Sequence, residues 1–236
     1  ASERTIENYI RDVHAFFNYV EANHQIVQID DIHKEHIRFY LKTLSHLSAS
    51  TVSRKMVSLR SFYKYLLKEE IIERNPMESF DLPKSQKKLP TVLSKQEVNI
   101  LLNSIEMNDF ISARNRAMLE LLYATGIRVS ELVSLTIYQL NLKMKYLNVI
   151  GKGDKERLIP LTDYVCKIMG KYIYDYRNPK LDFKDVDLLF FNNHLKKISR
   201  EDFYAILQEE VKKTSIQKKI SPHTLRHTFA THLFEN

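Results

Sequence analysis

The chain has 236 residues, 44% hydrophobic and 28% charged, a composition that excludes a disordered protein and fits one large or two modest domains. Its single cysteine, Cys166, excludes a disulfide framework and a cysteine-based zinc site and favours a reducing, cytoplasmic setting. No apolar run reaches the ~18 residues of a membrane helix, and the net charge of +7 favours a polyanionic partner. Only four glycines and six prolines predict a mostly helical protein.

The first 80 residues read as a small helical unit. Apolar residues recur at helical spacing over three stretches, which predict helices at about residues 3–22, 32–44 and 52–66. Ser50 or Thr51 is the expected N-cap of the third helix. A short fourth helix is expected around Ile71 and Ile72, before a proline stops it.

Basic residues are concentrated in the second and third of these helices. The window from Ile32 to Lys68 contains eight basic residues and one acid, Glu35, so it carries +7 by itself. The run is either a set of solvated helix faces or a surface that contacts phosphates, and we favour the second because it covers two successive helices. The candidate contacts are Lys34, Arg38, Lys42, Arg54, Lys55, Arg60 and Lys64.

A basic stretch without periodicity follows and contains two prolines, Pro83 and Pro90. It predicts an extended linker at residues 83–92, in which Lys87 and Lys88 are further candidate contacts. We therefore expect a helical domain at residues 1–82 and a second domain at residues 93–236.

The second domain is predicted to be mainly α with a small antiparallel β-sheet (α+β). Ser94 to Glu97 is a capping box, and a helix from Ala113 to Ala124 is expected to end at Thr125-Gly126. Alternating apolar residues from Leu140 to Leu161, with two glycines between them, predict a β-hairpin. Three more helices are expected, with N-caps at Thr162, Ser199 and Ser221.

The glycine break places Arg128 at the start of a new helix between two apolar stretches, so we expect this arginine to be partly buried. Burial of an arginine is costly unless its charge is paired. Two interpretations are open. Either Arg128 and Glu131 form a structural ion pair, or Arg128 binds an anionic ligand while Glu131 orients it.

Two further segments carry candidate groups for an anion. Residues 151–157 form the predicted hairpin tip, which presents Lys152 but lacks the spacing of a phosphate-binding P-loop. His223 and Arg226 are three residues apart, so they share one face of the first turn of the last helix. Free N–H groups and the helix dipole at that end favour an anion.

The histidines of the last helix do not predict a metal site. The pair His223 and His227 lacks the glutamate of a His-Glu-x-x-His motif, and Arg226 would repel a cation. We expect His227 and His232 to serve in helix packing or hydrogen bonding.

Three segments, residues 124–132, 151–157 and 223–227, resemble the tyrosine recombinases, most closely their Xer-type and integrase-like members. The segments follow one another in the order and at the separations typical of that family. Residues 47–52 resemble part of its core-binding domain. The resemblance covers nearly the whole chain and implies an N-terminal helical core-binding domain followed by a tyrosine-recombinase catalytic domain.

The resemblance implies roles for six residues: Arg128, Lys152, His223, Arg226, Glu131 and His227. The two arginines match the phosphate-binding pair, and the lysine matches the general acid toward the leaving 5′ oxygen. The first histidine matches the one that assists proton transfer, while Glu131 and His227 match accessory positions. A 3′-phosphotyrosyl bond conserves the energy of the broken phosphodiester, so rejoining needs no ATP. Because the cationic side chains stabilise the charge that develops on the phosphate, no metal or other cofactor is expected.

The nucleophilic tyrosine of the family lies C-terminal to the His-x-x-Arg segment. Here the sequence stops at Asn236, ten residues after Arg226, and the last of the 13 tyrosines, Tyr204, precedes that segment. We therefore expect the chain as given to lack the nucleophile and not to cleave DNA in cis. Three explanations stay open: a truncated chain, a C-terminal part outside the given sequence, or a variant that receives its tyrosine from a neighbouring subunit.

The function that the resemblance implies is site-specific recombination of double-stranded DNA. The expected role is Xer-like resolution of chromosome or plasmid dimers, carried out by a synaptic tetramer formed with or without a paralogous recombinase, and without membrane contact. The alternatives are an integrase of a mobile element and a non-catalytic DNA-binding module that retains the phosphate pocket. A topoisomerase with the same phosphotyrosyl chemistry is a third alternative, which we favour less because the N-terminal unit resembles that of the recombinases.

Overall fold

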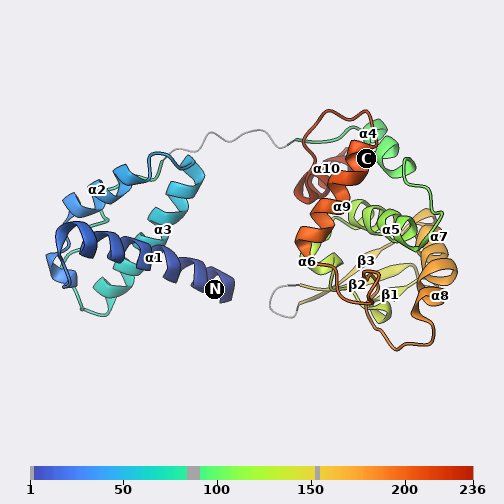
Figure 1. Ribbon diagram of the computed structural model, residues 1–236, viewed down its shortest axis with the longest axis horizontal. Coiled ribbons are helices and arrows are strands. Elements are labelled where there is room, and N and C mark those ends of the chain that lie inside the picture. Colours follow the sequence, from blue (N-terminus) through green and yellow to red (C-terminus); the bar gives the residue numbers. More distant parts are fainter. Residues whose placement is uncertain (1–2, 84–90, 152–154, 236) are drawn as a thin grey trace. The chain divides into compact units, whose positions relative to one another are not determined.

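The structure is a computed structural model that describes residues 3–83, 91–151 and 155–235. The chain divides into two compact units, residues 1–88 and 89–236 (Figure 1). Each unit has its own apolar core. The predicted fold class is confirmed, since helices dominate and the strands form one small antiparallel sheet. Within the described ranges, no helix is both long and apolar enough to cross a bilayer. Lys87, Lys88 and Lys152 lie outside the described residues.

The N-terminal unit consists of α1 (Glu3–His24), a short 3-10 turn (Ile29–Asp31), α2 (Lys34–Thr43) and α3 (Ala49–Lys68). Helix α1 packs against both α2 and α3. Its Phe16 meets Tyr40 of α2 and Tyr63 of α3 edge to face, with ring centroids 5.1 and 6.4 Å apart. Aromatic contacts of this geometry add to the apolar burial that holds the three helices together.

Two local predictions for this unit are wrong. The N-cap of α3 is Ser48, whose hydroxyl accepts the N–H of Thr51, so the helix begins earlier than expected. No helix forms around Ile72, because Glu70 takes a left-handed φ of 57° that ends α3, and the chain continues through turns. Ile72 and Met77 are nevertheless buried in the core.

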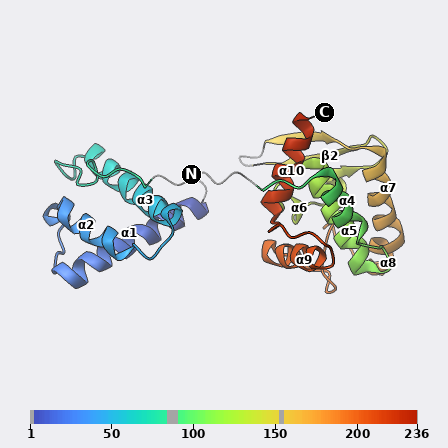
Figure 2. The same cartoon turned by 90° about the horizontal axis from the view of Figure 1, so that it is seen from above.

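The helices of the second unit are α4 (Lys95–Asn103), α5 (Phe110–Thr125), α6 (Val129–Leu132), α7 (Asp163–Lys171), α8 (Asn178–Leu181), α9 (Arg200–Lys212) and α10 (Pro222–Phe234). Helix α5 is the centre of this unit and contacts α4, α6, α7 and α10 (Figure 2). Eleven of its residues are buried, which explains why apolar residues occur on all of its sides. The predicted caps Ser94, Thr162, Ser199 and Ser221 are confirmed.

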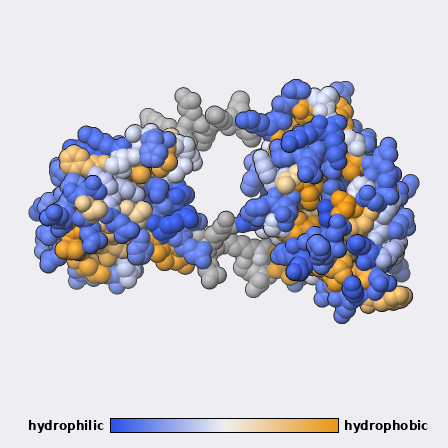
Figure 3. All heavy atoms as spheres, viewed as in Figure 1, coloured by the Kyte–Doolittle hydropathy of each residue, from blue (hydrophilic) through white to orange (hydrophobic). Residues whose placement is uncertain are grey.

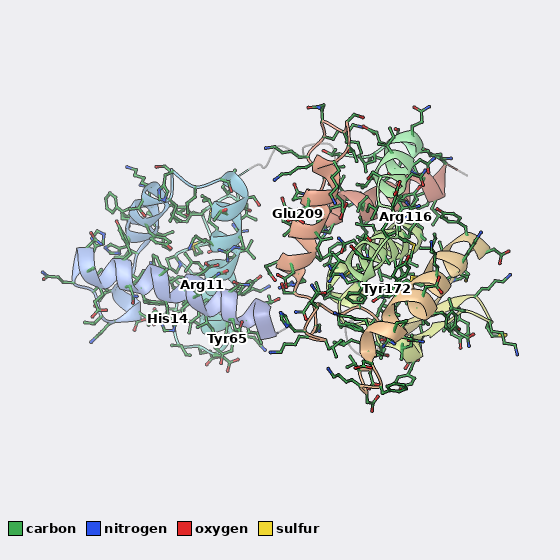
Figure 4. The ribbon with its side chains drawn as sticks, turned by 45° about the vertical axis from the view of Figure 1, so that its right-hand side comes forward. Arg11, His14, Tyr65, Arg116, Tyr172 and Glu209 are labelled. Carbon is green, nitrogen blue, oxygen red and sulfur yellow. The ribbon has the colours of Figure 1, made fainter. Side chains whose placement is uncertain are left out.

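Helix α7, which Thr162 caps, continues without a break through a π-helix at Tyr172–Arg177 into α8. Two polar groups of this segment are buried and hydrogen-bonded. The hydroxyl of Tyr172 donates to the carbonyl of Leu189 at 3.0 Å, and the guanidinium of Arg177 donates to the carbonyl of Val186 at 2.7 Å (Figure 4 labels Tyr172). These bonds fasten the π-helix to the segment that precedes α9.

The sheet has three antiparallel strands in the order β1 (Leu140–Asn141), β2 (Tyr146–Ile150) and β3 (Glu156–Pro160). The predicted hairpin is confirmed as β2–β3. The alternation that begins at Leu140 is not one strand, however, because a turn at 142–145, with φ 55° at Lys145, separates β1 from β2. In the β2–β3 register Arg157 stands opposite Val149.

Candidate active site

The site begins where α5 ends. Gly126 adopts a left-handed φ of 57° and donates its N–H to the carbonyl of Leu122 at 2.9 Å, a common way to end a helix. A Cβ at this position would overlap the ring of Phe229, which comes from α10. The glycine therefore serves both the turn of the chain and the close approach of α10 to the end of α5.

Arg128 follows this turn as the N-cap residue of α6. Its guanidinium lies 3.0 Å from the carboxylate of Glu131, and its backbone N–H donates to the same carboxylate at 2.8 Å. Arg128 is less buried than expected: its side chain is 56% exposed, whereas that of Glu131 is 8% exposed. The pair exists, and the arginine is still accessible to a ligand.

Arg157 on β3 also belongs to the site, although the sequence predicted no role for it. Its guanidinium donates to both carboxylate oxygens of Glu131, at 2.6 and 3.3 Å. Arg157 stands opposite the buried Val149, and directly opposite residues of antiparallel strands lie on the same face of a sheet. The alternating pattern could have indicated that face, but not the contact with Glu131.

Arg226 completes the group from the first turns of α10. Its guanidinium donates to the carbonyl of Gly126, so the α5 terminus holds this arginine in place. A cavity of about 390 Å³ lies among these elements. Its lining residues are Thr125, Gly126, Arg128, Arg157, Arg226, Phe229 and Ala230.

The three guanidinium groups influence one another and the carboxylate between them. Burial by itself would raise the pKa of Glu131, but hydrogen bonds from Arg157 and Arg128 outweigh it and hold that pKa below its ordinary value. Burial and the positive charge of Arg128 lower the pKa of Arg226. Because guanidinium groups stay protonated at neutral pH, three cations and one carboxylate leave the cavity with a surplus of positive charge.

The histidines take three different positions on α10. His223 is exposed at the start of the helix, one turn before Arg226, and does not line the cavity. His227 is exposed, so of the two roles expected for it, helix packing and hydrogen bonding, packing does not fit. His232 is buried, and its Nδ1 lies 2.9 Å from the hydroxyl of Tyr123, as expected for a hydrogen-bonded helix residue.

The basic residues of the N-terminal unit fall into two groups. Lys34, Arg38 and Lys42 are exposed along α2, and Lys64 is exposed on α3. Arg54, Lys55 and Arg60 bind oxygen atoms of the chain, since Arg54 and Lys55 contact the buried Asp12 and Arg60 donates to a backbone carbonyl. The α2 stripe is therefore the freer part of the predicted surface.

Models of known protein families match both units of the chain. Residues 91–236 match the phage integrase family, and residues 1–70 match the phage integrase N-terminal SAM-like domain. The chain belongs to the phage integrase family, that is, to the tyrosine recombinases.

Among curated proteins, the chain is 41% identical to a tyrosine recombinase XerD of Oceanobacillus iheyensis over 238 residues, which cover all of this chain and 80% of the relative. It is 40% identical over 240 residues to the XerD of Staphylococcus aureus, again covering all of this chain and 80% of the relative.

Solved structures share the fold. The XerH recombinase bound to its difH substrate has a TM-score of 0.74 at 23% identity, and the alignment covers 98% of this chain and 69% of the other. XerA recombinase is 27% identical with a TM-score of 0.55, covering 99% and 78%. A lambda integrase dimer bound to a core site has a TM-score of 0.74 at 17% identity, covering 98% and 79%.

Proposed function

We propose that this protein is a Xer-like site-specific recombinase that cuts and rejoins double-stranded DNA through a 3′-phosphotyrosyl intermediate. The observation that carries the proposal is the cavity in which Arg128, Arg157 and Arg226 surround one buried carboxylate. The XerD-named relatives, which match the chain over its full length, support the same activity.

The cavity suits the chemistry of phosphoryl transfer. Attack by a tyrosine oxygen on a phosphodiester builds negative charge on the oxygens of a five-coordinate phosphorus. A guanidinium presents N–H donors in a fork that matches two phosphate oxygens, and donors held in place before the reaction stabilise charge as it develops. Arg128 and Arg226 are the two we assign to the phosphate, because each lines the cavity from a different element.

Lys152 and His223 are assigned to proton transfer. Lys152 follows Gly151 at the end of the described part of the hairpin, and we give it the role of general acid toward the leaving 5′ oxygen on the strength of the family resemblance. His223 shares a helix face with Arg226, so an exposed imidazole stands one turn from a phosphate-binding group. We assign it to proton transfer and to holding the phosphate, with His227 as an accessory group.

The role we favour is resolution of chromosome or plasmid dimers in the cytoplasm by a synaptic tetramer, formed alone or with a paralogous recombinase. The XerD names of the relatives at about 40% identity support this choice over an integrase of a mobile element. Similarity to solved structures does not separate the two roles, because XerH and lambda integrase have the same TM-score of 0.74.

The test is covalent trapping on a nicked duplex, which loses its short 5′ fragment after cleavage and cannot be rejoined. The protein as its gene encodes it should form a covalent adduct with the DNA. Arg128→Ala and Arg226→Ala should each lower adduct formation by about 10²-fold or more, because each removes donors aimed at the developing charge. Affinity for the duplex, measured separately by gel shift, should change far less.

Adduct that persists undiminished in both arginine variants would refute the assignment of the cavity. Tight duplex binding without any adduct would favour the non-catalytic DNA-binding module. Sequencing the DNA trapped by the wild-type protein then separates dimer-resolution sites from the ends of a mobile element.

A further inference from the structure

Arg157 lies between the buried carboxylate of Glu131 and Gly151, at the loop end of the β2–β3 hairpin, and it also lines the cavity. It donates to both oxygens of Glu131, at 2.6 and 3.3 Å. Its Nη1 lies so close to Gly151 that a Cβ at this glycine would be 3.1 Å away from it. The side chain thus connects α6 to the hairpin strand that precedes Lys152.

The buried carboxylate of Glu131 requires a cationic partner that stays in contact with it when an anion binds to Arg128. Its side chain is 8% exposed, and a carboxylate taken out of water is costly unless its charge is paired. Arg128 contacts it with one guanidinium nitrogen and is 56% exposed, whereas Arg157 uses two nitrogens and is 37% exposed. Arg157 is therefore the more firmly held of the two cations.

We propose that Arg157 is a positioning residue of the cavity. It neutralises Glu131 and so releases the guanidinium of Arg128 to bind an oxyanion, a role that rests on the proposed phosphate-binding function. Among the described side chains, Arg128 would be the one cation left bonded to Glu131 if Arg157 were removed. The carboxylate and the phosphate would then compete for the same guanidinium.

A double-mutant cycle separates this role from direct contact with the phosphate. Arg157→Gln should lower the rate of covalent adduct formation between about 10- and 100-fold, the range expected when a charged group is misplaced by ~1 Å. In a Glu131→Gln background, the same change should cost less than about threefold, because no carboxylate remains to compete for Arg128. Duplex affinity should be the same within each pair.

Two outcomes of the cycle would overturn the proposal. An undiminished rate in Arg157→Gln would show that the residue has no role in the reaction. A loss of equal size in both backgrounds would show that Arg157 acts directly on the DNA and not through Glu131.

Two control variants define the chemistry required. Arg157→Lys keeps the charge but cannot make the two-nitrogen contact, and it should recover part of the lost rate. Arg200→Gln removes the same charge from the start of α9, where the side chain is exposed, and should leave the rate unchanged. Failure of Arg157→Lys to exceed Arg157→Gln, or an equal loss in Arg200→Gln, would count against the proposal.

A second measurement does not depend on activity. The pH titration of the Glu131 carboxyl carbon, followed by ¹³C NMR, should move to a higher pKa in Arg157→Gln, because the strongest hydrogen bonds to that carboxylate are lost. An unchanged titration would refute the proposal even if the wild-type protein formed adduct. If the wild-type protein formed no covalent adduct, the proposed function would fail. The titration of Glu131 would still show whether Arg157 neutralises that carboxylate.

Discussion

At the scale of single residues, Asp12 is the buried charge on which the N-terminal unit depends. Its side chain is 1% exposed and accepts hydrogen bonds from Arg54, Lys55 and Ser58, all of which belong to α3. Burial alone would raise the pKa of Asp12, but the hydrogen bonds from Arg54, Ser58 and Lys55 outweigh it and hold the pKa below its ordinary value. Asp12 therefore ties α1 to α3 in its ionised form.

We predict that Asp12→Asn lowers the free energy of unfolding of the N-terminal unit by about 2 kcal/mol at pH 7. This is less than the ~3–5 kcal/mol typical of a broken buried pair, because Arg54 and Lys55 can still reach water. A lowered pKa contributes stability above the ordinary carboxyl value of 3.8 and loses it as the pH falls through the folded value, so the two proteins should converge below that pH.

Urea unfolding followed by NMR signals of α1 and α3 measures this unit alone. Asp31→Asn removes an exposed carboxylate from the same unit and should change its stability by less than about 0.5 kcal/mol. A pH-independent difference between Asp12→Asn and wild type would contradict the electrostatic explanation.

At the scale of elements, the junction of α5 and α10 depends on Gly126. The residue combines a left-handed φ with close contact to Phe229, and its carbonyl binds Arg226. Gly126→Ala should destabilise the second unit by roughly 2–5 kcal/mol, since a left-handed backbone costs ~1–2 kcal/mol for a residue with a Cβ and overpacking costs ~1–3 kcal/mol.

Gly170→Ala is the matched control for this substitution. Gly170 lies inside α7, where a Cβ would have its nearest neighbour at 3.8 Å, and alanine there should stabilise the helix by ~0.5–1 kcal/mol. The two variants should therefore shift the thermal midpoint of the second unit in opposite directions. A shift of the same sign would mean that neither the backbone angle nor the Phe229 contact governs the junction.

The elements that the sequence predicts well are those whose signals are local. The capping box at Ser94 and Glu97 and the Ser221-Pro222 start of α10 need only neighbouring residues, and both are confirmed. The cap of α3 was misassigned because Ser48, Ser50 and Thr51 can all cap, and only the packed helix selects Ser48. The π-helix has no local signal, since buried hydrogen bonds to distant carbonyls hold it.

The residues of the candidate site also differ in whether the sequence alone predicts them. Arg128, Glu131 and Arg226 match positions with a role in the family that the sequence resembles. Arg157 lies in one of the same segments, but its role depends on its contact with Glu131 of α6. Its contact with Glu131 joins residues 26 positions apart, and no spacing rule predicts a pair at that distance. The sequence also does not predict that the carboxylate of Glu131, and not the guanidinium of Arg128, is the buried member of the pair.

At the scale of the whole molecule, the net charge of +7 predicts that the protein binds DNA and that its affinity falls as the salt concentration rises. Each phosphate contact releases bound counterions, so the slope of log K against log salt measures the number of contacts, at about 0.9 per phosphate on duplex DNA. The freer candidates are those of α2, where Lys34 and Arg38 are exposed and one turn apart. A long-range attraction from net charge alone would not depend on which basic residues are removed.

We therefore predict that Lys34→Gln with Arg38→Gln lowers the steepness of the salt dependence by about 1.8 on a duplex of about 30 base pairs. Lys167→Gln with Lys171→Gln removes the same charge from exposed positions one turn apart on α7, and should leave the slope unchanged. Fluorescence anisotropy between 50 and 300 mM salt measures the slope for both double variants.

Equal slopes in the two double variants would mean that the α2 stripe is a solvated helix face. A lower slope in the α2 variant alone would locate DNA contacts on the N-terminal unit. Because neither pair belongs to the arginine cavity, the result does not depend on cleavage.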